Sequence, residues 1–171
     1  GSTPYAPSVH GTGAADVWAT GGDLVFHRDA QGWSRFADEG WRALARPVPA
    51  AGSTIELSRV RAAAPDTVWV AASNNILRWD GQSWTAFNFD DPDYPHQQQT
   101  RGYDYRDIWV DGANDVWVVG HSDFVGSTMD FGRAHHFDGA SWTHKAIGLG
   151  PVDAIWRAGD VFWLANPTVD V

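Results

Sequence analysis

Residues 107–120 read DIWVDGANDVWVVG, and this stretch is the third of four near copies of one pattern. In each copy a β-branched aliphatic residue is followed, eight or nine positions later, by a Trp. The aliphatic residue and the Trp are Val9 with Trp18, Val60 with Trp69, Ile108 with Trp117, and Ile155 with Trp163. Successive Trps lie 51, 48 and 46 residues apart. Repeats of this size indicate stacked supersecondary units, none of which buries its apolar face alone.

An Asp-led turn that closes on a second Trp follows three of the copies. It reads DAQGW at residues 29–33, DGQSW at 80–84 and DGASW at 138–142. Asp-Gly between runs rich in β-branched and aromatic residues is a strong signal for a β-hairpin. The second copy predicts four short strands, at residues 57–63, 67–72, 75–79 and 83–88. The first and third copies predict the same four, at residues 8–11, 17–20, 23–28 and 33–37, and at 107–110, 116–120, 133–137 and 141–147.

Four antiparallel strands in about 45 residues describe one blade of a β-propeller. The predicted fold is therefore all-β: a single domain over residues 1–171, forming a β-propeller or partial β-propeller of about 3.5 four-stranded antiparallel blades. The blades are expected at residues 8–45, 57–90, 105–148 and, incomplete, 152–171. The fourth copy has room for two strands only, which leaves an open sheet edge of the kind that natural proteins avoid. We expect an incomplete unit rather than a ring that closes on itself.

Composition narrows the class of protein. Apolar residues make up 43% of the chain and include 11 Trp, which excludes a disordered polypeptide. No apolar run approaches the ~20 residues of a membrane-spanning helix, so we expect no membrane span. The net charge is −9, and residues 87–171 hold 13 of the 21 acidic residues but only 5 of the 12 basic ones. Such a surface repels a phosphate backbone, which argues against nucleic acid as a partner.

Three stretches resemble known repeats: DVWVVG at residues 115–120, NNILRWDGQSW at 74–84 and HHFDGASW at 135–142. They look like the Trp-rich propeller repeats of bacterial exported proteins, and they are similar to tectonin-type, lectin-like propeller repeats. The resemblance spans most of residues 8–167. It implies a propeller scaffold, a secreted or periplasmic location in bacteria, and sugar binding as one activity of such scaffolds. It assigns no role to individual residues, because function resides in sites rather than in folds.

Two segments depart from the repeat, at residues 89–104 and 121–132. Blade connectivity places the loop after a fourth strand on the same rim as the loop between second and third strands, so the two segments should adjoin. Loops on a rigid scaffold commonly carry function, and Tyr, His and Asp suit the stacking and hydrogen bonding of a sugar or peptide. The candidate ligand-binding residues are Tyr94, His96, Tyr103, Asp104, His121, Asp123 and Phe124.

Metal and catalytic motifs are absent from the sequence. Asp90, Asp91 and Asp93 lack the spacing of a calcium loop, and His121 with His135 or His136 lacks that of a zinc site. His135 and His136 share a predicted strand, where neighbours point to opposite faces. There is no cysteine, no Gly-x-Ser-x-Gly, no phosphate-binding loop and no His-Glu-x-x-His. We therefore expect no metal, no cofactor and no catalytic residue.

Three functions remain open at this point. The first is a non-catalytic binding module that recognises a carbohydrate or a protein ligand at the rim. The second is a structural role, in which the propeller fragment is completed by another chain, as in a homo-oligomer, or by the remainder of a larger propeller. The third is a glycosidase, which would need two carboxylates in one cleft.

The repeat also predicts which side chains are buried. Alternation along the first strand of each unit should bury Val9, Val60, Ile108 and Ile155 and leave His10 and Arg61 partly exposed. The Trps of the Val-Trp motif should pack between blades, and those of the Asp-led turns should anchor the hairpins. The first group is Trp18, Trp69, Trp117 and Trp163, and the second is Trp33, Trp84 and Trp142.

Overall fold

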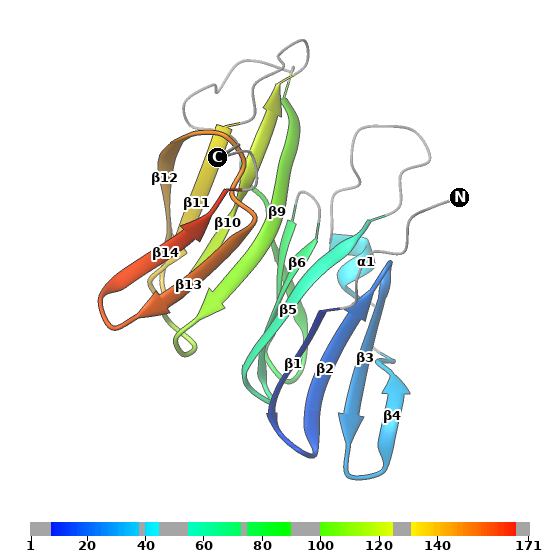
Figure 1. Cartoon of the computed structure of the whole chain (residues 1–171). Coiled ribbons are helices and arrows are strands. Elements are labelled where there is room, and N and C mark those ends of the chain that lie inside the picture. The colour runs from blue at the N-terminus through cyan, green and yellow to red at the C-terminus, as the bar shows by residue number, and fades with distance from the viewer. Residues whose placement is uncertain are drawn as a thin grey trace.

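The computed structural model describes residues 8–37, 40–44, 55–72, 75–89, 100–124 and 131–166. Within these ranges the chain forms three four-stranded sheets and a hairpin (Figure 1). The first sheet is β1 (Ser8–Gly13), β2 (Asp16–Gly21), β3 (Leu24–Asp29) and β4 (Gly32–Arg35). The second is β5 (Leu57–Ala64), β6 (Thr67–Ala72), β7 (Asn75–Trp79) and β8 (Trp84–Phe87). The third is β9 (Thr100–Val110), β10 (Val116–Phe124), β11 (Phe131–Phe137) and β12 (Trp142–Leu149), and the hairpin is β13 (Ala154–Ala158) and β14 (Val161–Ala165).

Strands pair in the order in which they occur along the chain, and every pair within a sheet is antiparallel. The all-β prediction and the four-stranded antiparallel sheets are thus confirmed. The main difference lies in the third sheet, whose first two strands are much longer than predicted. β9 begins at Thr100 and β10 ends at Phe124, so both rim segments are partly strand.

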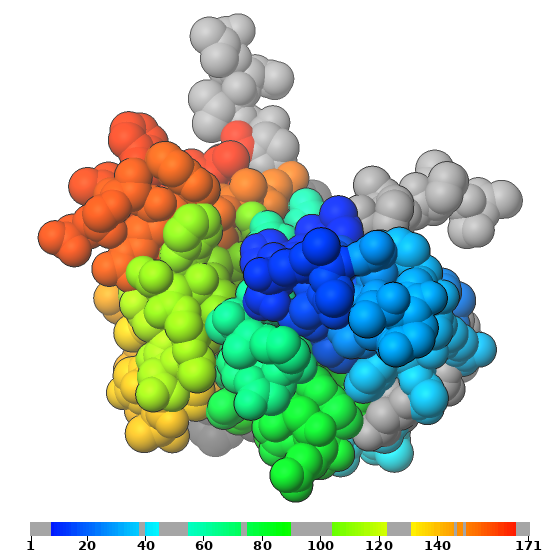
Figure 2. Space-filling model, turned by 90° about the horizontal axis from the view of Figure 1, so that it is seen from below, coloured from blue at the N-terminus to red at the C-terminus, as the bar shows by residue number. Residues whose placement is uncertain are grey.

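The first strand of each unit neighbours the first strand of the next, so that β1 lies by β5, β5 by β9, and β9 by β13. Figure 2 shows the units following one another along an arc, from blue through green and yellow to orange. Three apolar clusters fill the spaces between successive units. This arrangement is consistent with a blade-like β fold, and the described strands do not close a ring.

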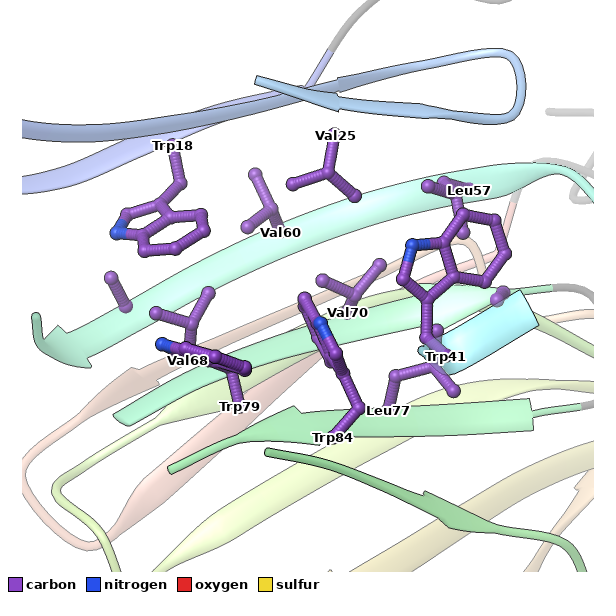
Figure 3. Close-up of a cluster of buried hydrophobic side chains, with 12 residues drawn as sticks. Trp18, Val25, Trp41, Leu57, Val60, Val68, Val70, Leu77, Trp79 and Trp84 are labelled. Carbon is purple, nitrogen blue, oxygen red and sulfur yellow. The ribbon is translucent and has the colours of Figure 1, made fainter. Parts of the chain in front are cut away.

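Each interface packs a Trp of one sheet against aliphatic side chains of the next. On the second sheet, Val60 and Val68 face the first sheet and join the cluster around Trp18 (Figure 3). Trp69 of the same sheet faces the third sheet. Trp69 in turn lies in one cluster with Ile108 of the third sheet. The division follows from strand geometry, since successive side chains point to opposite faces.

The Asp-led turns form the predicted hairpins. The Asp80 carboxylate accepts hydrogen bonds from the backbone N–H groups of Gln82 (2.9 Å) and Ser83 (2.7 Å), and these bonds, that of Ser83 foremost, hold the pKa of Asp80 below its usual value. Gly81 has φ +90°, a region that favours glycine, and a Cβ there would lie 2.8 Å from the Cβ of Asp66. Asp138 is held by the corresponding N–H groups in the third sheet.

The predictions for the aliphatic positions hold in three copies of four. Val60, Ile108 and Ile155 are buried, and His10 and Arg61 are partly exposed, as expected. Val9 is the exception, at 59% exposed. It points away from the second sheet, and no described sheet lies on that side of the first sheet, so the prediction for Val9 is wrong.

The Trp predictions fail on the outer faces of the first sheet and of the hairpin. Trp18 and Trp69 are buried and Trp117 is half-buried in the third interface, but Trp163 is 62% exposed, because no described sheet follows the hairpin. The turn residue Trp84 is buried and Trp142 packs into the second interface. The corresponding Trp33 is 53% exposed on the same face as Val9.

A short helix that the repeat does not predict, α1 (Trp41–Leu44), connects the first two sheets. Trp41 is buried in the first interface, where α1 packs against β8. Arg42 binds the carboxylate of Asp23 at 3.0 Å, which ties the helix to the β2–β3 turn.

A buried carboxylate joins the first strands of three units. One oxygen of Asp107 accepts hydrogen bonds from the Arg61 guanidinium (3.1 Å) and from the backbone N–H of Ile108 (3.0 Å). The other accepts from the backbone N–H of Ile155 (3.1 Å). Arg59 adds a contact at 3.5 Å. Several partners offset the cost of removing the carboxylate from water.

Trp69 and Trp163 hold the same position of the repeat in opposite surroundings, which makes a matched test. Trp69→Ala should lower the free energy of unfolding by ~3–5 kcal/mol, because it opens a cavity in the second interface. Trp163→Ala should change it by less than about 0.5 kcal/mol in dilute solution, because an exposed ring has little packing to lose. Urea denaturation followed by circular dichroism measures both. Equal losses would contradict the assignment of the two faces.

Removing the charge of Asp107 should loosen three units at once. Asp107→Asn should destabilise the protein by roughly 3 kcal/mol, since it leaves Arg61 and Arg59 without their carboxylate. The control is Asp111→Asn, whose 57% exposed side chain pairs with Arg157 and whose loss should cost no more than about 0.5 kcal/mol. Similar urea midpoints for the two variants would show that Asp107 is not a central contact.

Candidate functional site at the extended strands

The two segments that depart from the repeat meet as paired strands. In the third sheet, His121 of β10 lies opposite Asp104 of β9, and Ser122 lies opposite Tyr103. The pairing continues to Phe124 opposite Thr100. The segments therefore adjoin, as the sequence predicts, but through a strand ladder rather than as facing loops. Figure 1 shows β9 and β10 reaching beyond the ends of β5 and β6.

An irregularity in this ladder shapes the site. Gly120 pairs with Tyr105 while Val119 pairs with Asp107, which leaves Arg106 as an extra residue on β9. Such a bulge bends its strand and redirects the side chain of the extra residue. A Cβ at Gly120 would overlap the carbonyl oxygen of Asp104. Only glycine therefore lets the two strands approach so closely at this point.

The bulge brings three polar side chains together on the extension, here called the trio: Asp104, Arg106 and His121. The Arg106 guanidinium lies 2.6 Å from Oδ2 of Asp104, and Nε2 of His121 lies 4.0 Å from the same oxygen. The side chain of His121 is buried, whereas those of Asp104 and Arg106 are 38% and 31% exposed. The trio thus presents an acceptor and a donor side by side, partly open to solvent. This pair of groups suits a ligand with hydroxyl or amide groups.

The other predicted site residues are only partly placed. Tyr94 and His96 lie outside the described residues. Tyr103, Asp123 and Phe124 lie on β9 and β10, and nothing is described of their side chains. The structure brings Asp104 and His121 together and adds Arg106, which the sequence analysis missed. The signal for Arg106 is the bulge, and a bulge follows from strand register rather than from the local sequence.

An aromatic cluster lies on the face of the third sheet opposite Asp104 and His121. Phe89, assigned by sequence to the rim, instead stacks on buried His135 with ring centroids 4.4 Å apart, and Tyr105 packs edge-on against the same ring. His136 points to the opposite face, as predicted, and stacks on Trp117. Burial, reinforced by His144 and Arg133, lowers the pKa of His135 to about 3.

A second polar motif lies at the opposite end of β10. The carboxylate of Asp115 accepts a hydrogen bond from the Trp117 indole at 3.0 Å and lies 2.8 Å from Nε2 of His136, which stacks on that indole. Arg157 of the hairpin binds the same carboxylate at 2.8 Å. The motif fixes the Trp ring and links it to the next unit, and it leaves the carboxylate fully occupied, which favours a structural role.

The first sheet repeats this motif. Asp16 lies 2.8 Å from the Trp18 indole nitrogen and 2.9 Å from Nε2 of His27, and His27 stacks on Trp18. Burial alone would raise the pKa of Asp16, but hydrogen bonds from Thr12, His27 and Trp18 outweigh it and lower the pKa. The Asp of the Val-Trp motif is thus a packing residue, a role that its spacing alone did not reveal.

The described residues limit the chemistry of the site. Among them, no group of three or more His, Asp or Glu side chains is placed to hold a metal ion. The described part of the chain also holds no helix with the length and apolarity needed to cross a membrane.

The depressed pKa of His135 makes stability depend on pH. The unfolded chain takes up a proton near pH 6.5, whereas the folded protein does so near pH 3. The stability that comes from keeping His135 neutral is therefore fully present above about pH 6.5. The free energy of unfolding falls as the pH drops from about 6.5 towards about 3, by up to about 1.4 kcal/mol per pH unit. His135→Phe, which keeps the stacking on Phe89, should flatten this loss in urea titrations between about pH 7 and pH 4.

The control for this titration is His136→Gln, on the opposite face of the same strand, which keeps His135 and should keep the acid-side loss. An unchanged pH dependence in His135→Phe would contradict the assignment.

Comparison with known proteins adds no family to this description. No protein-family model matches the chain, and no curated protein sequence shows significant similarity to it. The candidate function therefore depends on the geometry of the chain itself.

Proposed function

We propose that this chain is a non-catalytic recognition module on a β-propeller scaffold, with its ligand site at the extension of β9 and β10. The most concrete ligand is a carbohydrate. The observation that carries the proposal is the trio of Asp104, Arg106 and His121, which is partly exposed on a strand extension that the other described sheets lack.

The scaffold is inferred from the way the sheets follow one another. Each described sheet pairs its strands in chain order, and each first strand lies beside the next first strand. Stacked blades around a central axis have this arrangement. We infer three blades and the inner half of a fourth, in agreement with the resemblance to Trp-rich propeller repeats.

A sugar fits the chemistry of the trio. The carboxylate of Asp104 accepts hydrogen bonds and the guanidinium of Arg106 donates them, so adjacent hydroxyl groups of one sugar could engage both. Aromatic rings that stack on the apolar face of the sugar would complete such a site.

Binding is favoured over glycoside hydrolysis by the composition of the trio. A glycosidase places two carboxyl groups on either side of the scissile bond, roughly 5–9.5 Å apart. The trio contains one carboxylate, and that carboxylate is engaged by Arg106. The arrangement suits holding a polar ligand better than protonating a leaving group.

A glycan array followed by titration calorimetry tests the proposal. The parent should bind at least one class of glycan, and Asp104→Asn or Arg106→Gln should weaken that binding at least tenfold, or about 1.4 kcal/mol. The melting temperature should change little, because both side chains are partly exposed. The control is Asp160→Asn, a fully exposed carboxylate on the β13–β14 turn, which should bind as the parent does.

Two results would contradict the proposal. If Asp104→Asn and Arg106→Gln both bind glycan as the parent does, the site lies elsewhere on the molecule. The absence of binding to any glycan on the array would exclude the carbohydrate form, and a screen for a protein ligand with the same variants would then follow.

A further inference from the structure

Two apolar faces have no sheet packed against them among the described residues. The first, here called the tail face, is the side of the β13–β14 hairpin that carries Trp156, Val161 and Trp163, each more than half exposed. The second, the head face, is the side of the first sheet that carries exposed Val9 and Trp33, together with half-buried Val17, Ala19 and Phe26. Exposed apolar surface of this kind marks an interaction site.

The tail face repeats one half of an interface already present in the molecule. Trp156 and Trp163 are cross-strand partners, and so are Trp109 and Trp117 of the third sheet. The pair on the third sheet packs in one cluster with Ile155 of the following unit, and Trp117 lies 4.6 Å, ring to ring, from Phe162. The tail face therefore carries the same residue pair in the same register, and no described sheet packs on it.

The head face repeats the other half of that interface. Val9 and Val17 occupy the positions that Ile155 and Phe162 hold in the hairpin, each pair lying on one face of its first two strands. In the second sheet the corresponding residues are Val60 and Val68, both fully buried against the first sheet. The head face therefore has the aliphatic surface on which a Trp pair packs.

The Trp that closes each Asp-led turn also indicates that the head face receives a Trp from a preceding sheet. Trp142 of the third sheet lies 5.8 Å, ring to ring, from Trp69 of the second, so this position receives the Trp of the preceding sheet. Trp84 is buried at the corresponding place in the second sheet. Trp33 differs in that no described sheet lies on its side of the first sheet. A Trp supplied from outside, such as Trp163, would give Trp33 the kind of contact that Trp142 makes with Trp69.

We propose that a second copy of this chain docks its head face on the tail face, which continues the stack of sheets from one chain into the next. Each copy carries one face of each kind, so the two surfaces are present in equal number. The contact is head-to-tail, and such a contact yields a closed ring when the rotation allows it and an open chain when it does not. This surface is independent of the proposed ligand site on β9 and β10.

Sedimentation velocity across about 1–100 µM protein tests the docking, a range that detects micromolar affinity. The parent should gain mass with concentration, to two copies or more. Trp163→Asp should remain monomeric because it puts a charge on the tail face, and Val9→Asp should remain monomeric because it does so on the head face. Both changed side chains are solvent-exposed, so both variants should keep the parent's circular dichroism spectrum.

Mixing the two variants identifies the geometry. Trp163→Asp retains an intact head face and Val9→Asp an intact tail face, so an equimolar mixture should form a two-chain species that neither variant forms alone. The control is Leu44→Asp, which alters an exposed side chain of α1 outside both faces and should associate as the parent does.

Three results would overturn the inference. A parent that stays monomeric over the whole range has no such contact. Self-association of either variant alone means that the faces pair with themselves or that another surface is used. A mixture that stays monomeric, with the parent associating, shows that the head and tail faces do not complement each other.

Discussion

The packing of a Trp from one sheet against the aliphatic side chains of the next is the contact on which the structure depends. A single four-stranded sheet of this chain has two apolar faces and cannot shield both by itself. Trp18 over Val60 and Val68, and Trp69 over Ile108, bury one face of each neighbour at a time. The free energy of unfolding of such an array is approximately a sum of terms from each unit and from each interface between neighbours. Each interface therefore needs its own apolar contact, and the same kind of residue pair supplies it.

Polar groups fix the geometry that this packing leaves free. Apolar contacts are not directional, and a sheet could slide on its neighbour without losing much buried area. Asp107 prevents such sliding near the first strands, because its two oxygens bind groups from β5 and from β13. At the turns between the first and second strands, Asp16 and Asp115 hold the indoles of Trp18 and Trp117 in position. Hydrogen bonds to a charged group are strong enough to specify one register.

The candidate site depends on the same scaffold and departs from it at one point. The third sheet keeps its contacts to both neighbours while its first two strands continue past the length used elsewhere. The bulge at Arg106 and the close approach at Gly120 then set Asp104 beside His121. Phe89, Tyr105 and His135 pack together on the other face of the same sheet. An irregular segment held on rigid packing is the arrangement that the proposed ligand site requires.

The amino-acid sequence by itself determined the local structure of this protein. The period of the Val-Trp motif, the alternation along each strand and the turns at Asp80 and Asp138 predict antiparallel four-stranded sheets, because each of these signals acts over a few residues. The adjacency of the two irregular segments also followed from connectivity. Two of the candidate residues, Asp104 and His121, are indeed cross-strand neighbours.

Tertiary structure alone decided which of the repeated residues are buried and what surrounds Asp104. Val9 matches Val60 in sequence, and Trp163 matches Trp69, yet the first of each pair is exposed and the second buried. The difference is whether another sheet lies opposite, which a residue's own neighbourhood in the sequence does not encode. Arg106 likewise reaches Asp104 only because a bulge shifts the pairing of β9 with β10. Burial and register are properties of two surfaces in contact, and a repeat describes only one of them.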